Sequence, residues 1–314
     1  MYIFGPIMSR RFGRSLGVNV IPEKICSFDC IYCEVGRTKT TTMARRPYAP
    51  ADKILAEFNE RYPSVERRMD VITVTGYGEP TLNTEFEKVL DGIKESAHHP
   101  VVILTNSSTM HIPQVFETLK KFDVVVPSID AVRVGKFKQV DNPHPSVDIN
   151  QIKRALVDFS KDYRGKLLIE LLLVKGVNDE EEDLAAFAEY IGEVNYSQVQ
   201  LTTVFRPPSH QDVARLTDEE LAEKYLILSS YGVERIIIPG DICSTADNYS
   251  LELSEDDICA ALKMRPMSVA ALAEGLSIDP ILAEVMVEDL LTRGLLNSAE
   301  YDNEVYYSLR RGGA

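Results

Sequence analysis

Short apolar runs alternate with amphipathic segments along the first 240 residues, and this alternation constrains the fold more than any other feature. Such runs are typical of strands buried on both faces, and the longer segments between them are typical of helices. The predicted strands are 16–22, 70–75, 100–105, 123–127, 166–174, 197–205 and 235–239. The predicted helices are 51–62, 85–97, 112–122, 150–163, 181–194 and 218–230. This α/β order predicts a parallel sheet, and six or so β-α units favour an open, partial barrel over a closed eightfold one.

Three cysteines lie within one eight-residue stretch that directly follows the first predicted strand. Cys26, Cys30 and Cys33 have the spacing C-x3-C-x2-C. A [4Fe–4S] cluster normally takes four cysteine ligands, so three thiolates from one loop leave one iron open to another ligand. Open coordination positions are where metal sites carry out chemistry. A zinc knuckle is the competing interpretation, but it needs a fourth Cys or His nearby, and the first ninety residues contain no other.

A glycine-rich turn follows the second predicted strand. Gly76, Tyr77, Gly78 and Glu79 come directly after the strand 70–75. Glycine lets a backbone pass close to a ligand, and the carboxyl ends of parallel strands meet at one rim of the sheet. We therefore expect this turn to lie beside the cysteine loop and to bind a ligand there. An ordinary tight turn is the alternative.

Three further polar residues end later strands at the same rim. Asn106 and Ser128 could bind ribose hydroxyl groups, which need paired donors and acceptors once buried, or could simply begin turns. Arg206 could meet a carboxylate or phosphate through its fork of donors, or could be a solvated loop arginine. Both interpretations stay open for each residue.

The cysteine spacing resembles that of the radical S-adenosylmethionine (SAM) enzymes, in which the methionine end of SAM fills the open iron position. Tyr32 matches an aromatic position common in those enzymes, and the turn 76–79 resembles their segment that binds the amino group of SAM. Residues 5–18, 128–131 and 142–145 resemble one branch, the iron–sulfur oxidoreductases related to the tRNA wyosine-base synthases. The resemblance covers about residues 3–210.

The resemblance implies a partial (β/α)6 radical SAM barrel with Cys26, Cys30 and Cys33 as ligands of a [4Fe–4S] cluster. SAM would chelate the fourth iron, and a reductant such as flavodoxin or ferredoxin would supply one electron. SAM would then be cleaved to methionine and a 5′-deoxyadenosyl radical that removes hydrogen from an unidentified substrate, with macromolecules among the candidates. The residues expected to contact SAM or substrate are Tyr32, Gly76, Tyr77, Gly78, Glu79, Asn106, Ser128 and Arg206.

The last sixty residues have a different pattern, so we expect residues 1–240 to form the barrel, 241–253 a linker and 254–314 a winged-helix domain. The predicted helices are 256–263, 268–275 and 279–294, and the short strands are 295–297 and 305–309. Ser268 and Asp279 occupy N-cap positions, and Gly294 a C-cap position. Residues 254–314 hold eleven acidic and five basic side chains, which disfavours DNA binding. Docking to a protein, a peptide or the enzyme's own core is favoured.

The formal net charge of −14 disfavours broad nucleic-acid binding, which needs a basic surface. Arg10, Arg11 and Arg14 could still form a local basic rim, so tRNA-base modification remains an alternative, although a disfavoured one. A glycyl-radical-enzyme activase and a non-catalytic iron–sulfur regulator are two further alternatives. Cys243 and Cys259 are too few for a second cluster and are expected to be buried hydrophobes.

No stretch approaches eighteen consecutive apolar residues, so no membrane span is expected. Five cysteines, three of them in one loop, do not form a disulfide framework. A reducing, cytoplasmic location is therefore expected.

Overall fold

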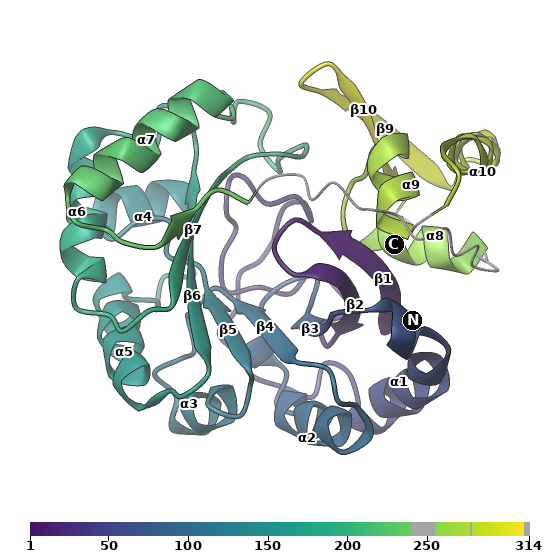
Figure 1. Cartoon of the computed structure of the whole chain (residues 1–314), viewed down its shortest axis with the longest axis horizontal. Coiled ribbons are helices and arrows are strands. Elements are labelled where there is room, and N and C mark those ends of the chain that lie inside the picture. Colours follow the sequence, from purple (N-terminus) through teal and green to yellow (C-terminus); the bar gives the residue numbers. More distant parts are fainter. Residues whose placement is uncertain (240–254, 277, 311–314) are drawn as a thin grey trace.

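An eight-stranded sheet forms the centre of the protein (Figure 1), as seen in a computed structural model that describes residues 1–239, 255–276 and 278–310. The strands lie side by side in chain order, β1 pairs antiparallel with β2, and each later neighbour pairs in parallel. They are β1 (Ile3–Ser9), β2 (Gly13–Asn19), β3 (Val71–Thr75), β4 (Val101–Thr105), β5 (Val124–Pro127), β6 (Lys166–Leu173), β7 (Gln198–Thr203) and β8 (Ile236–Ile237). All seven predicted strands are present, with shifted ends.

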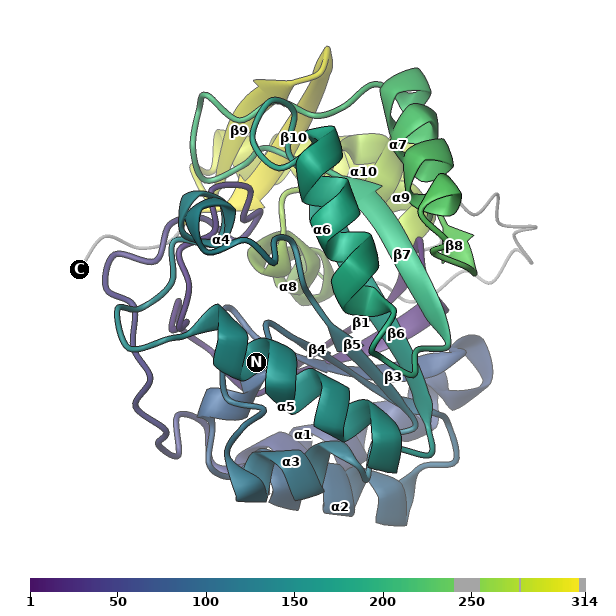
Figure 2. The same cartoon turned by 90° about the vertical axis from the view of Figure 1, so that its left-hand side faces the viewer.

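Helices cover the outer side of the arc that these strands follow (Figure 1), and Figure 2 shows α5 and α6 in front of the strands. The helices are α1 (Ala51–Val65), α2 (Phe86–Ser96), α3 (Pro113–Leu119), α4 (Val134–Val140), α5 (Ile149–Asp162), α6 (Glu181–Ile191) and α7 (Asp218–Ser230). Six of them confirm the prediction, and α4 was not predicted because two turns of helix carry too little periodicity. Local signals fix the starts of some helices, as where the Thr217 side chain caps α7 with Glu220 in a capping box.

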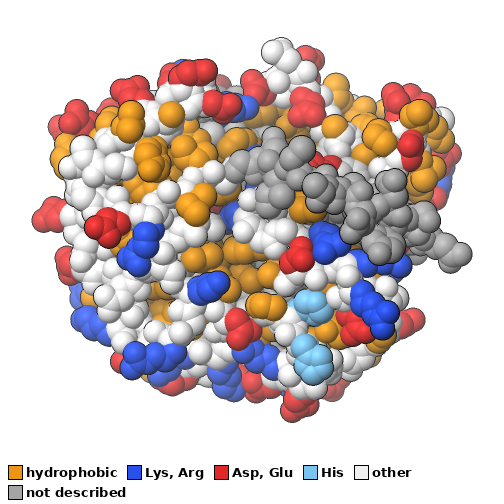
Figure 3. Space-filling view, in the orientation of Figure 1, with side chains coloured by type: hydrophobic (Ala, Val, Ile, Leu, Met, Phe, Trp, Pro, Cys, Tyr) orange, Lys and Arg blue, Asp and Glu red, His pale blue; other side chains and the backbone are white. Residues whose placement is uncertain are grey.

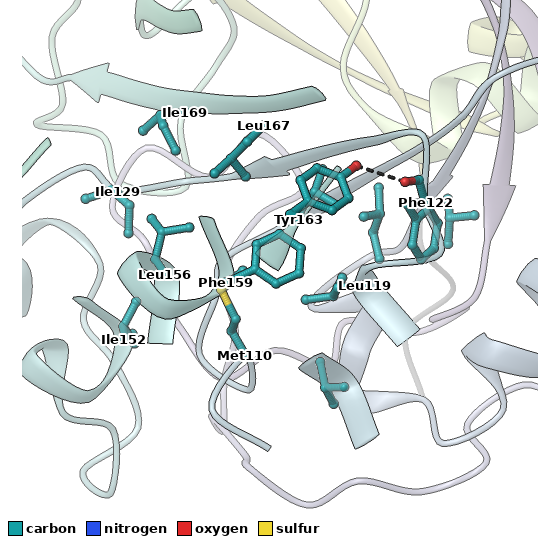
Figure 4. Packing of buried hydrophobic residues seen from close by; sticks show 14 of the residues in the cluster. Met110, Leu119, Phe122, Ile129, Ile152, Leu156, Phe159, Tyr163, Leu167 and Ile169 are labelled. Carbon is teal, nitrogen blue, oxygen red and sulfur yellow. Dashed lines mark hydrogen bonds between the residues drawn. The ribbon is translucent and has the colours of Figure 1, made fainter. Parts of the chain in front are cut away.

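The main hydrophobic core lies between the strands and these outer helices. In Figure 4, Phe159 of α5 packs beside Tyr163, and the two rings stack with centroids 4.8 Å apart. The Tyr163 hydroxyl donates a hydrogen bond to the carbonyl oxygen of Phe122 at 2.9 Å. The buried ring therefore keeps its polar end satisfied while its body fills the core.

The first strand of the sheet was missed by the sequence analysis, and the cysteine loop follows the second strand instead of the first. The predicted strand 16–22 corresponds to β2 (Gly13–Asn19), which begins and ends earlier in the chain than predicted. Gly5 has a φ of +90°, and the pairing register shifts between Phe4 and Ile7. This irregularity breaks the alternation that would reveal a strand. Gly17 leaves room for the ring of Phe4, since a Cβ atom there would lie 1.9 Å from Cζ of Phe4.

The C-terminal residues form three helices and a two-stranded antiparallel hairpin. These elements are α8 (Glu255–Met264), α9 (Val269–Leu276), α10 (Pro280–Thr292), β9 (Leu296–Tyr301) and β10 (Glu304–Leu309). The predicted caps are confirmed: the Asp279 side chain accepts from the backbone of Ile281, Ser268 accepts from Ala271, and Gly294 has a φ of +72°. The predicted linker 241–253 and Cys243 lie outside the described residues.

This C-terminal segment contacts the barrel on two sides. Ile7 of β1 belongs to the same buried cluster as Leu272 of α9 and Leu290 of α10, which explains why the segment lies beside β1 in Figure 1. On the other side, the Tyr306 hydroxyl donates to the carbonyl oxygen of Phe205, just after β7, at 3.1 Å. The segment therefore contacts both the first strand of the sheet and the chain that leaves β7.

Cys259 packs against this same cluster but is only half-buried, so it is less enclosed than the buried hydrophobe that was expected. Among the described helices, none is both long and apolar enough to cross a bilayer.

Candidate active site

The cysteine loop lies at the carboxyl end of β2 and is held by hydrogen bonds to distant parts of the chain. The backbone nitrogen of Ile31 donates to the carbonyl oxygen of Val140 at 2.9 Å. The buried carboxylate of Asp29 accepts from the backbone nitrogen of Thr38 at 2.6 Å and from the Arg37 side chain at 3.0 Å. These contacts fix the loop on both sides of Cys30 and Cys33, as a preorganised ligand loop requires.

Each of the three thiols has a polar neighbour. Lys24 Nζ donates to Cys33 Sγ at 3.0 Å, Asn106 Nδ2 approaches Cys26 Sγ at 3.6 Å, and Cys30 Sγ donates to an Asp141 oxygen at 3.5 Å. Burial raises the pKa of Cys26 to about 12, although the Lys24 charge opposes it. A coordinating thiol is deprotonated by the metal itself, and the ammonium group of Lys24 favours the resulting thiolates.

The donor set fits a cubane cluster better than a single metal ion. Within the parts of the chain that the structure describes, no three His, Cys, Asp or Glu side chains converge as ligands of one ion. Tetrahedral zinc needs such convergence. A cubane binds each thiolate to a different iron, so its ligands need not meet at one point. Three thiols on one anchored loop therefore suit a [4Fe–4S] cluster with one iron left open.

The turn after β3 packs directly against the start of the cysteine loop. The backbone nitrogen of Glu79 donates to the carbonyl oxygen of Ile25 at 3.1 Å, and that of Tyr77 donates to Ile21 at 2.9 Å. A Cβ atom at Gly78 would lie 1.5 Å from the Ile25 oxygen, so only glycine permits this approach. The turn and the cysteines are thus brought together as expected.

Glu79 is buried, and its carboxylate is engaged by the protein. One oxygen accepts from the hydroxyls of Thr81 at 2.6 Å and Thr105 at 2.7 Å, and the other accepts from the backbone nitrogen of Asn106 at 2.7 Å. Burial raises the pKa of Glu79, and these hydrogen bonds partly offset the shift. The side chain ties the turn to the end of β4, which leaves the backbone of the turn facing the cysteine loop. Tyr77 is also buried, with Lys263 of α8 5.7 Å from its ring centre.

Asn106 and Ser128 lie at the rim where they were expected, and both contact site residues. Asn106 Nδ2 donates to the Ser27 hydroxyl at 2.9 Å, beside Cys26. The Ser128 hydroxyl donates to Glu170 of β6 at 3.2 Å. Neither side chain merely starts a turn.

Tyr32 connects the cysteine loop to the segment that follows β5 and, through it, to β6. Its hydroxyl donates a short hydrogen bond to Asp130, and the second oxygen of Asp130 accepts from the backbone nitrogen of Leu172 at 2.9 Å. Burial raises the pKa of Asp130 to about 7, with the bonds from Tyr32 and Leu172 opposing the shift. The aromatic residue predicted from the cysteine motif is thus part of a buried polar network.

Arg206 is not a solvated loop arginine, because it pairs with a carboxylate next to the cysteine loop. Its Nη1 atom lies 2.8 Å from a carboxylate oxygen of Glu34, the residue that follows Cys33, and its side chain is 15% exposed. Burial alone would raise the pKa of Glu34, but the guanidinium groups of Arg206, Arg265 and Arg11 lower it overall.

A cavity of about 230 Å³ lies beside Cys33, inside the arc of strands. Its walls come from the β1–β2 turn, the cysteine loop, β6, β7 and the C-terminal segment. The charged and amide side chains that line the cavity are Arg10, Arg11, Glu34, Glu170, Gln200, Arg206 and Arg265.

Several of these residues could not be identified from the sequence. Lys24 lies two positions before Cys26, but no motif marks it. Arg265 joins the site from the far end of the chain, and Gln200 lies in the middle of β7. Only the pairing of β6 with β7 and the docking of α8 bring Gln200 and Arg265 beside Cys33.

Residues 20–188 match the family model described as the radical SAM superfamily. The chain is 30% identical over 306 residues to a UPF0026 protein of Methanocaldococcus jannaschii, covering 97% of this chain and 94% of that protein. It is also 30% identical over 309 residues to a GTPase Obg of Brachyspira hyodysenteriae, covering 98% of this chain but only 45% of that protein. A dual-specificity RNA methyltransferase RlmN of Marinomonas sp. is 27% identical over 183 residues, covering 53% of this chain and 47% of the methyltransferase.

Solved structures show the same fold at low sequence identity. A radical SAM methyltransferase from Sphaerobacter thermophilus superposes with a TM-score of 0.56 at 17% identity, covering 71% of this chain and 66% of that one. Streptococcus suis SuiB bound to S-adenosylmethionine superposes with a TM-score of 0.51 at 17% identity, covering 76% of this chain and 52% of that one.

Proposed function

The chain belongs to the radical SAM superfamily, which uses a [4Fe–4S] cluster and SAM, and from this premise we propose that it cleaves SAM reductively to start radical chemistry on an organic substrate. The observation that carries the proposal is the close packing of two segments: the loop with three thiols and the turn 76–79, joined where Gly78 meets Ile25. This contact supports the proposal because it would bring the turn close to the iron that the three cysteines leave open.

Cys26, Cys30 and Cys33 would hold the cluster, and Lys24 would stabilise the thiolate of Cys33. When bound, the cluster would supply an electron, taken from a reductant such as flavodoxin or ferredoxin, for cleavage of SAM to methionine and a 5′-deoxyadenosyl radical, which would remove a hydrogen atom from the substrate and end as 5′-deoxyadenosine. The protein's part is to position these groups and to exclude water and oxygen.

The remaining rim residues would bind and orient SAM. The backbone of the turn 76–79 would meet the SAM amino group, with Glu79 holding the turn in place. Asn106 and Ser128 would bind the ribose hydroxyls. The buried bond from Tyr32 to Asp130 would keep the cysteine loop against β6 during turnover.

Anaerobic reconstitution with iron and sulfide tests this proposal. Reduced protein supplied with SAM should release 5′-deoxyadenosine and methionine, measured by liquid chromatography and mass spectrometry. A reconstituted protein that carries a cluster but neither binds nor cleaves SAM would contradict the proposal and favour a non-catalytic iron–sulfur protein.

RNA modification is the second candidate, favoured by the similarity to an RNA methyltransferase. Two of the residues suggested as a basic rim are already paired with carboxylates: Arg14 pairs with Asp70 at the surface at 3.4 Å, and the partly buried Arg11 pairs with Glu170 at 2.9 Å. On the face drawn in Figure 3, basic side chains lie in small groups between acidic and uncharged ones. Salt-dependent retention of total tRNA by the full chain would support this candidate, and no retention at low salt would remove it.

We further propose that the C-terminal segment is a winged-helix unit whose docking partner is the enzyme's own barrel. Its buried cluster includes Ile7 of β1, and Arg61 of α1 pairs with Asp257 of α8 at 2.7 Å. A partner protein or peptide would then have to bind a face of this segment that β1 leaves uncovered.

A further inference from the structure

We propose that Lys24 raises the reduction potential of the cluster held by the cysteine loop, by placing an ammonium charge against one of the thiolate ligands. This inference rests on the proposed function and concerns how readily the same site accepts its electron. It is carried by the contact between Lys24 and Cys33, by the anchored backbone around Lys24, and by the position of this side chain outside the two cavities of the site.

The ammonium group of Lys24 lies against the sulfur atoms of the cysteine loop. Its Nζ atom donates to Cys33 Sγ at 3.0 Å. Burial alone would lower the pKa of Lys24, but the negative charges of Cys33, Cys26 and Cys30 raise it overall. The charge of Lys24 therefore acts on all three ligands, and most strongly on Cys33.

Buried carboxylates act on the same sulfur atoms in the opposite sense. An oxygen of Asp141 lies 3.5 Å from Cys30 Sγ, and the charge of Glu79 acts on Cys26. Negative groups beside a cluster disfavour the addition of an electron, because they repel the extra charge. Lys24 offsets this effect from within the cysteine loop's own approach segment.

The backbone on both sides of Lys24 is anchored, so its side chain starts from a defined position. The backbone nitrogen of Ile25 donates to the carbonyl oxygen of Glu23 at 2.8 Å, and the carbonyl oxygen of Ile25 accepts from the backbone nitrogen of Glu79 at 3.1 Å. The close approach of Gly78 fixes the same carbonyl group. Groups held in this way beside a metal ligand tune the metal site without binding the metal.

Lys24 is not placed to bind SAM or substrate. It does not line the cavity beside Cys33. It also does not line the neighbouring cavity of about 150 Å³, whose wall includes Gly76 of the turn after β3. Lys24 therefore acts through the sulfur atom of Cys33, as a residue that tunes the cluster.

The direction of the effect follows from the charge that reduction adds. Reduction of a [4Fe–4S]²⁺ cluster to [4Fe–4S]⁺ takes one electron from the reductant and adds one negative charge close to the ammonium group. A fixed cation stabilises the more negative state more strongly, and water screens this attraction only weakly at a partly buried site. Hydrogen bonds to the sulfur atoms and the local net charge set the potentials of such clusters. Removal of the Lys24 charge should therefore lower the potential.

A redox titration of the reconstituted full chain tests the inference. The midpoint potential is measured anaerobically, without SAM, by electron paramagnetic resonance during titration with dithionite and redox mediators. Lys24→Met removes the charge but keeps a long side chain, and its equilibrium constant for reduction should fall at least tenfold, a shift of about −59 mV for one electron. Lys24→Arg keeps a cation and should stay near the wild-type potential. An unchanged potential in Lys24→Met would overturn the inference.

Two further variants separate the charge from its surroundings. Lys24→Gln keeps a hydrogen-bond donor for the Cys33 sulfur but carries no charge, so its potential should also fall. Lys161→Met is the matched control, because it removes the same charge from α5, where the side chain is 59% exposed, and its potential should equal that of the wild type. Iron and sulfide are counted in every sample. If neither neutral variant of Lys24 holds a cluster, Lys24 is a structural residue and the inference is overturned.

Titration with SAM separates this inference from the proposed function. If the cluster-loaded wild type neither binds nor cleaves SAM, the proposed function fails, and the potentials of the variants still test the role of Lys24. If the wild type cleaves SAM but Lys24→Met keeps the wild-type potential, only this inference fails. If Lys24→Met weakens SAM binding and leaves the potential without SAM unchanged, Lys24 binds the carboxylate of SAM, and the tuning role is overturned.

Discussion

Gly78 shows how one residue controls the geometry of the site. Its backbone lies against the carbonyl group of Ile25, so that the turn after β3 and the cysteine loop approach more closely than any side chain would allow. The sequence indicated a glycine with a role near a ligand. The structure adds that this glycine is also required for packing between two backbone segments.

Gly78→Ala should therefore destabilise the fold by about 3 kcal/mol, because its Cβ atom would overlap the Ile25 oxygen and force the backbones apart. The free energy of unfolding is measured by chemical denaturation of the apo protein. Gly135→Ala is the matched control, since no atom lies within 4 Å of its Cβ position and the glycine lies in α4. The control should be neutral or slightly stabilising. Equal effects at the two positions would contradict the proposed packing role.

Cys30→Ala should abolish the visible absorbance of the reconstituted cluster and the formation of 5′-deoxyadenosine, because two thiolates cannot hold the cubane with one iron open. Cys259→Ala is the control, as this thiol lies in the C-terminal cluster. It should retain both signals. Turnover by the Cys30 variant at the wild-type rate would contradict the ligand assignment.

At the scale of elements, β1 and the C-terminal helices depend on each other. Ile7 is 5% exposed and packs in one cluster with residues of α8, α9 and α10. The sequence did not reveal β1, because this strand carries a bulge. It also did not reveal the contact between β1 and the C-terminal helices, because that contact joins residues about 250 positions apart. The helices themselves were predictable, because their caps and apolar periodicity are local.

Ile7→Ala should lower the free energy of unfolding by about 3 kcal/mol, through lost burial and the cavity that remains. It should also make the C-terminal segment more sensitive to limited proteolysis. Val285→Ala, on the exposed side of α10 at 57% exposure, should change stability by less than about 0.5 kcal/mol. Wild-type protease resistance in the Ile7 variant would argue against docking through β1.

At the scale of the whole molecule, the cluster site is built from segments that are far apart in the chain. The cysteine loop is bonded to Val140 and Asp141, and the cavity beside it is completed by Arg265. A cofactor bound only by this folded arrangement stabilises it by linkage.

Reconstitution of the cluster should therefore raise the melting temperature of the wild type, by about 2–4 °C for each kcal/mol of binding energy. Cys30→Ala treated with the same iron and sulfide should melt at its apo temperature. Both are measured by anaerobic scanning calorimetry. An equal rise in the variant would mean that iron binds elsewhere.

The sequence by itself determined the order of strands and helices apart from β1 and α4, the three-cysteine motif and the glycine turn, because each of these depends on residues that are neighbours in the chain. Spacing, periodicity and caps act over a few positions, and the parallel sheet then requires the motifs to share one rim. Only the tertiary structure decided that Glu79 is held by Thr105, that Arg206 faces Glu34, and that Arg265 lines the cavity. Such contacts form only when surfaces that are far apart in the chain pack together, and patterns among neighbouring residues do not predict which surfaces will do so.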